Sequence, residues 1–167
     1  MSWISPDLVT DSSGFWFDDE LAIDDDTDTF AYSSVDNNSW SQELTFIPPY
    51  DGEFGEDETS CIICNKIRFN AYRNMGNPYD IRRAKVRLFL ETGGYIEKIW
   101  TTYGDHSWTE WDLEGTYYVN VALISFYNNG PGGKTAKLYE FDFGKAAARG
   151  KVNGSLATSI LVNRGLT

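Results

Sequence analysis

The chain is poor in the side chains that most catalytic sites use. Its 167 residues include one histidine and two cysteines. The histidine lies in Asp105-His106-Ser107, but three successive residues do not readily converge as nucleophile, base and orienting acid. Acidic residues are so abundant that no particular pair indicates glycoside hydrolysis. These shortages predict a protein that is not an enzyme.

The two cysteines give little support for a metal or redox function. They are spaced as Cys61-Ile-Ile-Cys64, without a second pair or a nearby histidine to complete a zinc site. Positions three apart on a strand point to opposite faces. The spacing leaves two alternatives open, which are buried free thiols and one disulfide at the end of a loop.

Basic residues and long apolar runs are also scarce. The chain has 14 Lys and Arg against 25 Asp and Glu, a formal charge of −11, which argues against binding to nucleic acid or to an anionic membrane surface. No apolar run approaches the roughly 20 residues that cross a bilayer. The first residues, Met1 to Asp7, lack the basic and apolar regions of a signal peptide. We expect a protein made in a cytoplasm, with neither nucleic acid nor membrane as a partner.

Aromatic residues, by contrast, make up 16% of the chain, and they favour strands and contact surfaces. Charged and apolar residues alternate with period two, as in Lys85-Val-Arg-Leu-Phe-Leu90. Turn residues such as Gly93-Gly94 separate the alternating runs. The pattern predicts an all-β sandwich or jelly roll. The predicted strands are 41–47, 61–71, 84–90, 95–100, 116–126 and 137–143.

Two acidic segments form a candidate metal site. Ala22-Ile-Asp-Asp-Asp-Thr-Asp-Thr29 carries four carboxylates in eight residues, and Glu140 lies in a late strand. Carboxylates and backbone carbonyls on a tight loop are typical ligands of Ca²⁺. A solvated acidic turn is the alternative.

The order of these motifs resembles the galactose-binding-like jelly roll. An acidic Ala-x-Asp-x-Asp-x-x-Thr turn is followed by a Trp-containing strand, by Asn65-Lys-Ile-Arg-Phe69, by the pair 86–90 and 95–99, and finally by Leu138-Tyr-Glu-Phe141. Discoidin domains and many carbohydrate-binding modules share this fold, and the sequence is also similar to divergent domains of tailed-phage structural proteins. The resemblance covers about residues 1–144.

The resemblance also implies a ligand set for a structural calcium ion. Carried over to this chain, the ligands are Asp24, Asp26, Thr29 and Glu140, with a backbone carbonyl near Ala22. The family usually has glycine where this chain has Asp25, which suggests a left-handed backbone at that position. The ion would attach the N-terminal loop to the last strand.

A cluster of aromatic and polar residues forms a second candidate site. Aromatic rings beside carboxylates bind sugars and also form protein interfaces. In a strand from Ser107 to Leu113, Trp108 and Glu110 share one face while Trp111 lies on the other, so only part of the cluster can share a surface. Trp111 is equally well explained as a core residue. The candidate ligand-binding residues are Trp100, Tyr103, His106, Trp108, Glu110 and Trp111.

The C-terminal segment differs from the body. Residues 145–167 contain four basic residues and no acidic one, so the first 144 residues carry −11 − 4 = −15. The apolar run Ile160, Leu161 and Val162 in this basic arm predicts a contact with a second copy, and a frayed terminus is the alternative. The sequence thus divides into a β-sandwich (1–144) and an oligomerising arm (145–167).

Two functions follow from these features. The arm and the missing signal peptide favour a virion protein, such as a capsid decoration, head or tail-associated subunit that forms homo-oligomers and contacts other virion proteins. The Trp-rich cluster favours the alternative, a carbohydrate-binding module with glycans as partners. Both hypotheses are non-catalytic. The virion hypothesis is preferred because of the arm.

Overall fold

The computed structural model describes residues 2–50, 61–73 and 81–147, and these residues are mostly in strands. One short 3-10 helix, η1, spans Asp19–Ala22. The strands are β1 (Ser2–Ile4), β2 (Leu8–Thr10), β3 (Trp16–Phe17), β4 (Ala31–Val35), β5 (Ser39–Trp40), β6 (Leu44–Ile47), β7 (Ile62–Ala71), β8 (Ile81–Leu90), β9 (Tyr95–Trp100), β10 (Ser107–Asn128) and β11 (Lys134–Lys145). The predicted all-β class is confirmed.

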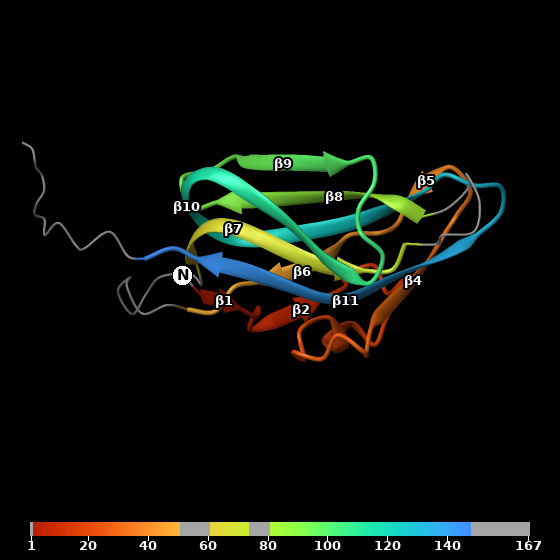
Figure 1. Cartoon of the computed structure of the whole chain (residues 1–167), viewed down its shortest axis with the longest axis horizontal. Coiled ribbons are helices and arrows are strands. Elements are labelled where there is room, and N and C mark those ends of the chain that lie inside the picture. Colours follow the sequence, from red (N-terminus) through yellow and green to blue (C-terminus); the bar gives the residue numbers. More distant parts are fainter. Residues whose placement is uncertain (1, 51–60, 74–80, 148–167) are drawn as a thin grey trace, which may run out of the picture.

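Strand β10 belongs to both layers of the sandwich. Residues Ser107 to Asp112 and Tyr117 to Val119 pair with β7, and the last part of β10 pairs with β8 on one side and β6 on the other. The register with β7 shifts between Asp112 and Tyr117, where Glu114 has a positive φ of 57°. The long strand therefore bends from one layer into the next (Figure 1).

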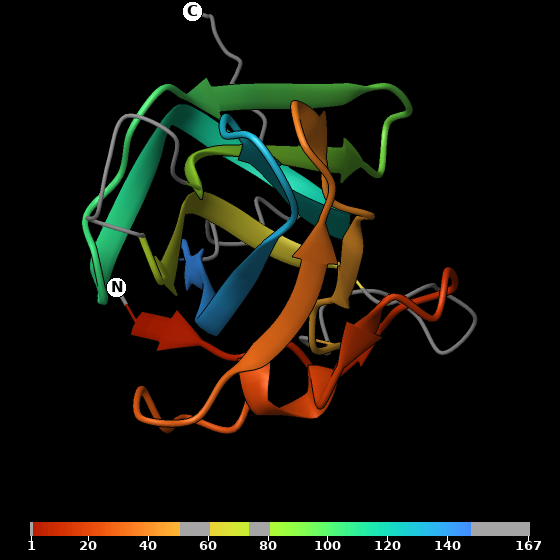
Figure 2. The same ribbon diagram turned by 90° about the vertical axis from the view of Figure 1, so that its right-hand side faces the viewer.

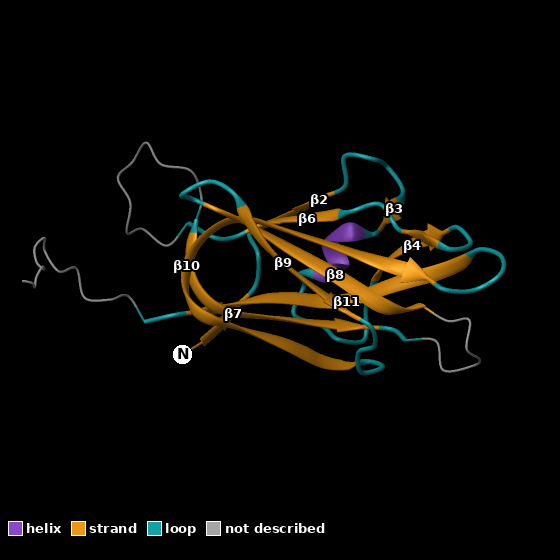
Figure 3. Cartoon of the chain, turned by 90° about the horizontal axis from the view of Figure 1, so that it is seen from above, coloured by secondary structure: helices purple, strands orange, loops and turns teal. Residues whose placement is uncertain are grey.

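The two layers follow from this pairing. The first layer has the order β2–β6–β10–β8–β9, and the second has the order β10–β7–β11–β4–β3. Seen along the strands, the layers curl around a shared interior (Figure 2). The view from above shows strands almost throughout, with the one helical turn beside β3 and β4 (Figure 3).

The core forms where the inward faces of the two layers meet. Phe46 of β6 and Phe141 of β11 stack with their ring centroids 4.5 Å apart and their planes within 6°. Both side chains have no exposed surface. Phe69 and Phe126 add an edge-on pair, with centroids 6.3 Å apart. Burying such rings supplies a large part of the hydrophobic stabilisation.

Most of the predicted strands are present, with changes at their ends. The predicted strand 95–100 matches β9, and Gly93 and Gly94 turn the hairpin before it with φ values of 93° and 76°. The predicted strand 116–126 is only the last part of β10, which begins at Ser107. The short strands β1 to β5 were not predicted, because two to five residues are too few to show alternation.

The body continues past the predicted boundary at residue 144. Strand β11 ends at Lys145, and the backbone N–H of buried Ala146 donates a hydrogen bond to the carbonyl of Ile63 (2.9 Å). The predicted contact residues Ile160, Leu161 and Val162 lie outside the described residues, so their role in oligomers stays a prediction.

The structure separates the two alternatives for the cysteines. Cys61 and Cys64 are both buried and form no disulfide with each other, and burial raises the pKa of the Cys64 thiol to about 12. A thiol in this state is inert. Among the described residues, no helix has the length and apolar character needed to cross a membrane.

The stacked phenylalanines give a test of the core. Phe141→Ala should lower the free energy of unfolding by about 3 to 5 kcal/mol, because it leaves a cavity between the layers. Phe15→Ala is the matched control, since that ring is 57% exposed, and it should cost less than about 1 kcal/mol. Urea unfolding measures both values. Equal losses would contradict this account of the core.

Candidate functional site

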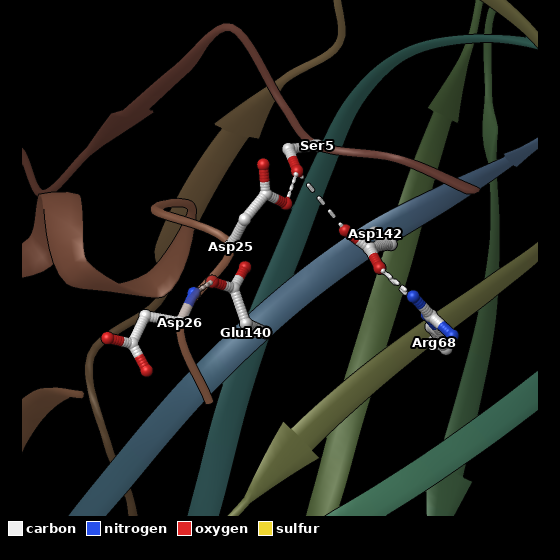
Figure 4. Close-up of polar contacts among 6 residues, drawn as sticks. All are labelled: Ser5, Asp25, Asp26, Arg68, Glu140 and Asp142. Atoms are coloured by element: carbon white, nitrogen blue, oxygen red, sulfur yellow. Dashed lines mark hydrogen bonds and ion pairs between the residues drawn. The ribbon is translucent and has the colours of Figure 1, made fainter. Parts of the chain in front are cut away.

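The acidic loop covers the outer face of the second layer. Along β11, Phe141 and Phe143 face the core, so Glu140 and Asp142 point outward. The loop that follows η1 lies across them (Figure 4). Glu140 and Asp142 are nonetheless only 2% and 4% exposed. The structure thus joins the acidic loop to the last strand, as the sequence predicted.

Hydrogen bonds connect Glu140 directly to this loop. The backbone N–H of Asp26 donates to Oε2 of Glu140 (2.9 Å) and to Oδ1 of Asp24 (3.0 Å). The hydroxyl of Thr29 donates to Oδ2 of Asp24 (2.8 Å). Asp25 has a φ of 62°, the left-handed conformation that suits the glycine expected at this position. Aspartate adopts this conformation more readily than most residues.

The four predicted metal ligands do not contribute in the same way. Glu140 and Asp24 present carboxylates to each other, and Thr29 holds Asp24 in place. The carboxylate of Asp26 points away from Glu140 (Figure 4) and accepts a hydrogen bond from the N–H of Asp28 (2.9 Å). In this structure Asp26 therefore acts through its backbone rather than through its side chain.

Sequence reasoning missed three neighbours of Glu140. Carboxylate oxygens of Asp25, Glu140 and Asp142 lie within 4.8 Å of one another. The hydroxyl of Ser5 contacts Asp25 (2.6 Å) and Asp142 (3.5 Å). The signal for Asp142 was present, because a residue two positions from Glu140 on a strand shares its face. No comparable signal marks Ser5, which lies more than 130 residues away in the sequence.

The negative charge of this cluster is only partly balanced. Burial, the Asp24 carboxylate and the charge of Asp142 together raise the pKa of Glu140 to about 8. Burial also raises the pKa of Asp142, although Arg68 forms a 2.7 Å ion pair with it. Oε1 of Glu140 is buried and has no hydrogen-bond partner among the described residues. Oxygen ligands with unbalanced negative charge suit Ca²⁺, so the residues present fit the ion that the fold implies.

The six predicted ligand-binding residues are divided between the core and the surface. Trp100 and Trp111 meet edge to face with centroids 6.1 Å apart and pack against the core. Tyr103 is 5% exposed, and its hydroxyl donates to the carbonyl of Tyr72 (2.9 Å). These three rings thus stabilise the sandwich. Trp108, at 37% exposure, is the aromatic member that the structure presents to solvent.

Trp108 is linked to the acidic cluster through an arginine. The guanidinium carbon of Arg68 lies 3.7 Å from the ring centroid of Trp108 and 4.4 Å from that of Trp3. Nε of Arg68 donates to Asp142 (2.7 Å). Exposed Glu110 pairs with Arg68 in the register of β10 and β7. An indole, a guanidinium and carboxylates therefore share the outer face of the second layer.

His106 supports the acidic loop. Its Nε2 lies 2.6 Å from the carbonyl oxygen of Thr27, and its ring stacks on Tyr139 with centroids 4.0 Å apart. These contacts join the start of β10 to the loop. His106 thus holds the acidic loop against β11.

The comparisons with known proteins bear on the fold. No family model and no curated protein matches the chain. A solved structure titled CBM32 of AlyQ in complex with 4,5-unsaturated mannuronic acid has a TM-score of 0.57 and 15% identity, covering 87% of this chain and 100% of that chain. CBM32-1 from a family 31 glycoside hydrolase of Clostridium perfringens has a TM-score of 0.55 and 15% identity, covering 84% and 96%.

A third solved structure extends the same comparison. Chitosan-binding module 1 of a chitosanase/glucanase from Paenibacillus sp. IK-5 has a TM-score of 0.52 and 12% identity, covering 84% of this chain and 96% of that chain. At such identities the likeness concerns the fold. The chain has the galactose-binding-like jelly roll of these carbohydrate-binding modules, which confirms the resemblance seen in the sequence. The likeness to tailed-phage proteins stays a prediction.

The raised pKa of Glu140 predicts how stability depends on pH. The folded protein binds this proton more tightly than the unfolded chain, so the contribution is complete below the ordinary pKa of 4.5 and is lost as the pH rises to about 8. With a chelator present, the free energy of unfolding should fall across this range. The free energy of unfolding of Glu140→Gln should fall by about 2 kcal/mol less than that of the unmodified chain.

Urea unfolding at a series of pH values measures this effect. Glu110→Gln is the matched control, since Glu110 is exposed, and it should follow the unmodified chain. Identical pH profiles for the unmodified chain and Glu140→Gln would contradict the assignment.

Proposed function

We propose that this protein is a non-catalytic carbohydrate-binding module whose ligand surface surrounds Trp108. The observation that carries the proposal is the exposed indole of Trp108, fixed in place by Arg68 at 3.7 Å and flanked by exposed Glu110. An apolar ring surface beside hydrogen-bonding groups suits the two kinds of surface that a sugar presents, its C–H face and its hydroxyls.

The arrangement of these groups is rigid before a ligand arrives. Trp108 and Glu110 lie on one paired strand, and Arg68 lies on its neighbour β7. The ion pair to Asp142 (2.7 Å) restricts the guanidinium, which in turn contacts the indole. A preformed surface loses less conformational entropy on binding. Of the predicted residues, Trp108 and Glu110 form this surface, whereas Trp100, Tyr103 and Trp111 support it from the interior.

The structural neighbours support a sugar as the ligand class. One is described with 4,5-unsaturated mannuronic acid, and another, GH31 CBM32-2, is described as bound to GalNAc, with a TM-score of 0.55 and 14% identity. Proteins with this fold bind glycans, so we prefer the carbohydrate-binding hypothesis to the virion hypothesis. The virion assembly role stays a prediction, and its arm lies outside the described residues.

We further propose that the cluster around Glu140 holds a structural Ca²⁺. The carboxylates of Glu140 and Asp24 would be its principal ligands, with Asp25 and Asp142 close to the same oxygens. The ion would supply positive charge where burial now raises the pKa of Glu140. Its role is to hold the acidic loop on β11, beside the strand pair that carries Trp108.

Replacing Trp108 tests the glycan surface. Trp108→Ala should lower glycan affinity by about tenfold or more, because it removes the apolar surface while the core stays intact. A glycan array identifies a ligand, and calorimetry then compares the variants. Tyr118→Ala is the control, since that ring is 40% exposed on another part of β10. Unchanged affinity in Trp108→Ala with an unchanged melting curve would refute the proposed surface.

Replacing the acidic residues one at a time tests the calcium site. Added Ca²⁺ should raise the melting temperature of the chelated protein by mass action. Glu140→Gln should abolish this rise, because it removes the buried ligand. Asp26→Asn should keep it, since that carboxylate points away from Glu140 (Figure 4). A rise that survives in Glu140→Gln, or no rise in the unmodified chain, would rule out the site.

A further inference from the structure

The outer face of the first layer carries a row of cations. On β8, inward Ala84 and Val86 are fully buried, so Arg83, Lys85 and Arg87 project together from the opposite face. The register places Arg83 beside Tyr127 of β10, and Tyr127 beside Trp40 of β5. This row is unusual in a chain whose net charge is −11.

Several cations of the described residues lie over aromatic rings, and they differ in whether they also pair with a carboxylate. Arg68 and Arg87 form ion pairs with Asp142 (2.7 Å) and Glu97 (2.8 Å). Arg83 and Lys85 form no ion pair in the described part of the chain. They lie over aromatic rings instead, with Arg83 4.5 Å from the centroid of Tyr127 and Lys85 4.6 Å from that of Trp40.

The difference matters because a ring has no net charge. A cation–π contact fixes the position of a cation without neutralising it. Arg83 also has a buried Nε with no hydrogen-bond partner in the described residues. The rings of Trp40 and Tyr127 pack against each other with their centroids 5.2 Å apart, so they hold both cations as one unit. Arg83 and Lys85 are thus positioned and remain available to an anion.

A pocket lies in the segments next to the strands that carry these two rings. It has a volume of about 400 Å³ and is lined by Asn37, Asn38, Asn129, Gly130 and Pro131, a size within the range of small-molecule sites. Its lining residues are close in sequence to the two rings, because Asn38 precedes Trp40 by two residues and Asn129 follows Tyr127 by two. The pocket residues thus flank strand β5 and the end of β10, and the register places Arg83 beside Tyr127 in the same part of the sheet. Strand β5 marks this end of the sandwich (Figure 1).

The buried amide of Asn128 also preorganises the pocket. Asn128 is fully buried, and its Nδ2 donates to the carbonyls of Val35 (2.9 Å) and Gly132 (2.8 Å). Its Oδ1 accepts from the N–H of Gly130 (2.9 Å). These bonds tie the segment after β4 to the turn after β10. Amides and backbone groups held in this way suit the hydroxyls of a sugar.

We propose that this pocket, together with Arg83 and Lys85, binds a carboxylated sugar. The amides would bind its hydroxyls, and the two ring-held cations would bind its carboxylate. The site does not depend on Trp108, because Trp108 lies on the outer face of the second layer, whereas Arg83 and Lys85 lie on that of the first. It gives the protein a second sugar surface with a preference for acidic residues.

Nearby acidic residues limit the size of the positive region. Glu97 pairs with Arg87, and the charge of Glu43 also acts on Arg87. Arg83 and Lys85 are therefore the cations of the row that have no carboxylate partner within residues 2–50, 61–73 and 81–147. Distant carboxylates of the body matter less, because the Debye length is about 8 Å at physiological ionic strength. The local pair of cations, not the net charge, decides which anion is bound.

Matched oligosaccharides and charge variants test this proposal. Calorimetry compares an oligogalacturonate with a neutral galactose oligomer of equal length and with inorganic polyphosphate. The oligogalacturonate should bind more tightly than either.

Arg83→Gln and Lys85→Gln should each weaken the binding of the oligogalacturonate about tenfold. Lys98→Gln is the control, because it removes the same charge from a lysine that also lies over a ring, Trp100, at 5.3 Å. Melting curves establish that every variant is folded.

Each result decides for or against the site. Loss of oligogalacturonate binding in Arg83→Gln, with binding kept in Trp108→Ala and Lys98→Gln, would support it whether or not Trp108 binds neutral glycans. Equal binding of polyphosphate would reduce the effect to charge attraction and overturn the proposal. No oligogalacturonate binding, or equal losses in Arg83→Gln and Lys98→Gln, would also overturn it. If Arg83→Gln fails to fold, Arg83→Lys and Lys85→Gln carry the same comparison.

Discussion

The central constraint in this molecule is that one strand serves both layers. Strand β10 pairs with β7 at its start and with β8 and β6 at its end, so the alternation of its side chains decides two outer surfaces. Trp108 faces outward in the second layer, and Tyr127 faces outward in the first. Trp111 lies on the opposite face of β10 from Trp108 and packs against Trp100 in the interior. Alternation along β10 thus divides a run of aromatic residues into surface and core.

Charge is arranged around this framework in three ways. Buried carboxylates gather at Glu140, where one arginine is too little to balance them. Arg68 and Arg87 are paired with carboxylates, whereas Arg83 and Lys85 rest on rings. A carboxylate partner cancels a charge and a ring leaves it. The proposed anion surface and the proposed cation site thus follow from the different partners of these charged groups.

The candidate sites were only partly visible in the sequence. Glu140 and the acidic loop were identified correctly as neighbours, because short acidic turns and late strands are local patterns. The rotation of the Asp26 carboxylate away from Glu140 was not, since it depends on the hydrogen bond to the N–H of Asp28. Tyr103 looked like a surface ring, yet its hydroxyl reaches the carbonyl of Tyr72 in the interior. Spacing alone does not distinguish a half-exposed ring from a buried one.

The sequence by itself determined the class of fold, the strand positions with clear alternation and the acid-rich turn. These depend on period two and on local turn chemistry, which are properties of short segments. Only the tertiary structure decided which acids meet, which cations lie over rings and which tryptophan is exposed. Each of those depends on contacts between segments that are distant in the sequence, as in Ser5 with Asp142 or Arg83 with Tyr127. Long-range register brings such groups together, and no local pattern encodes it.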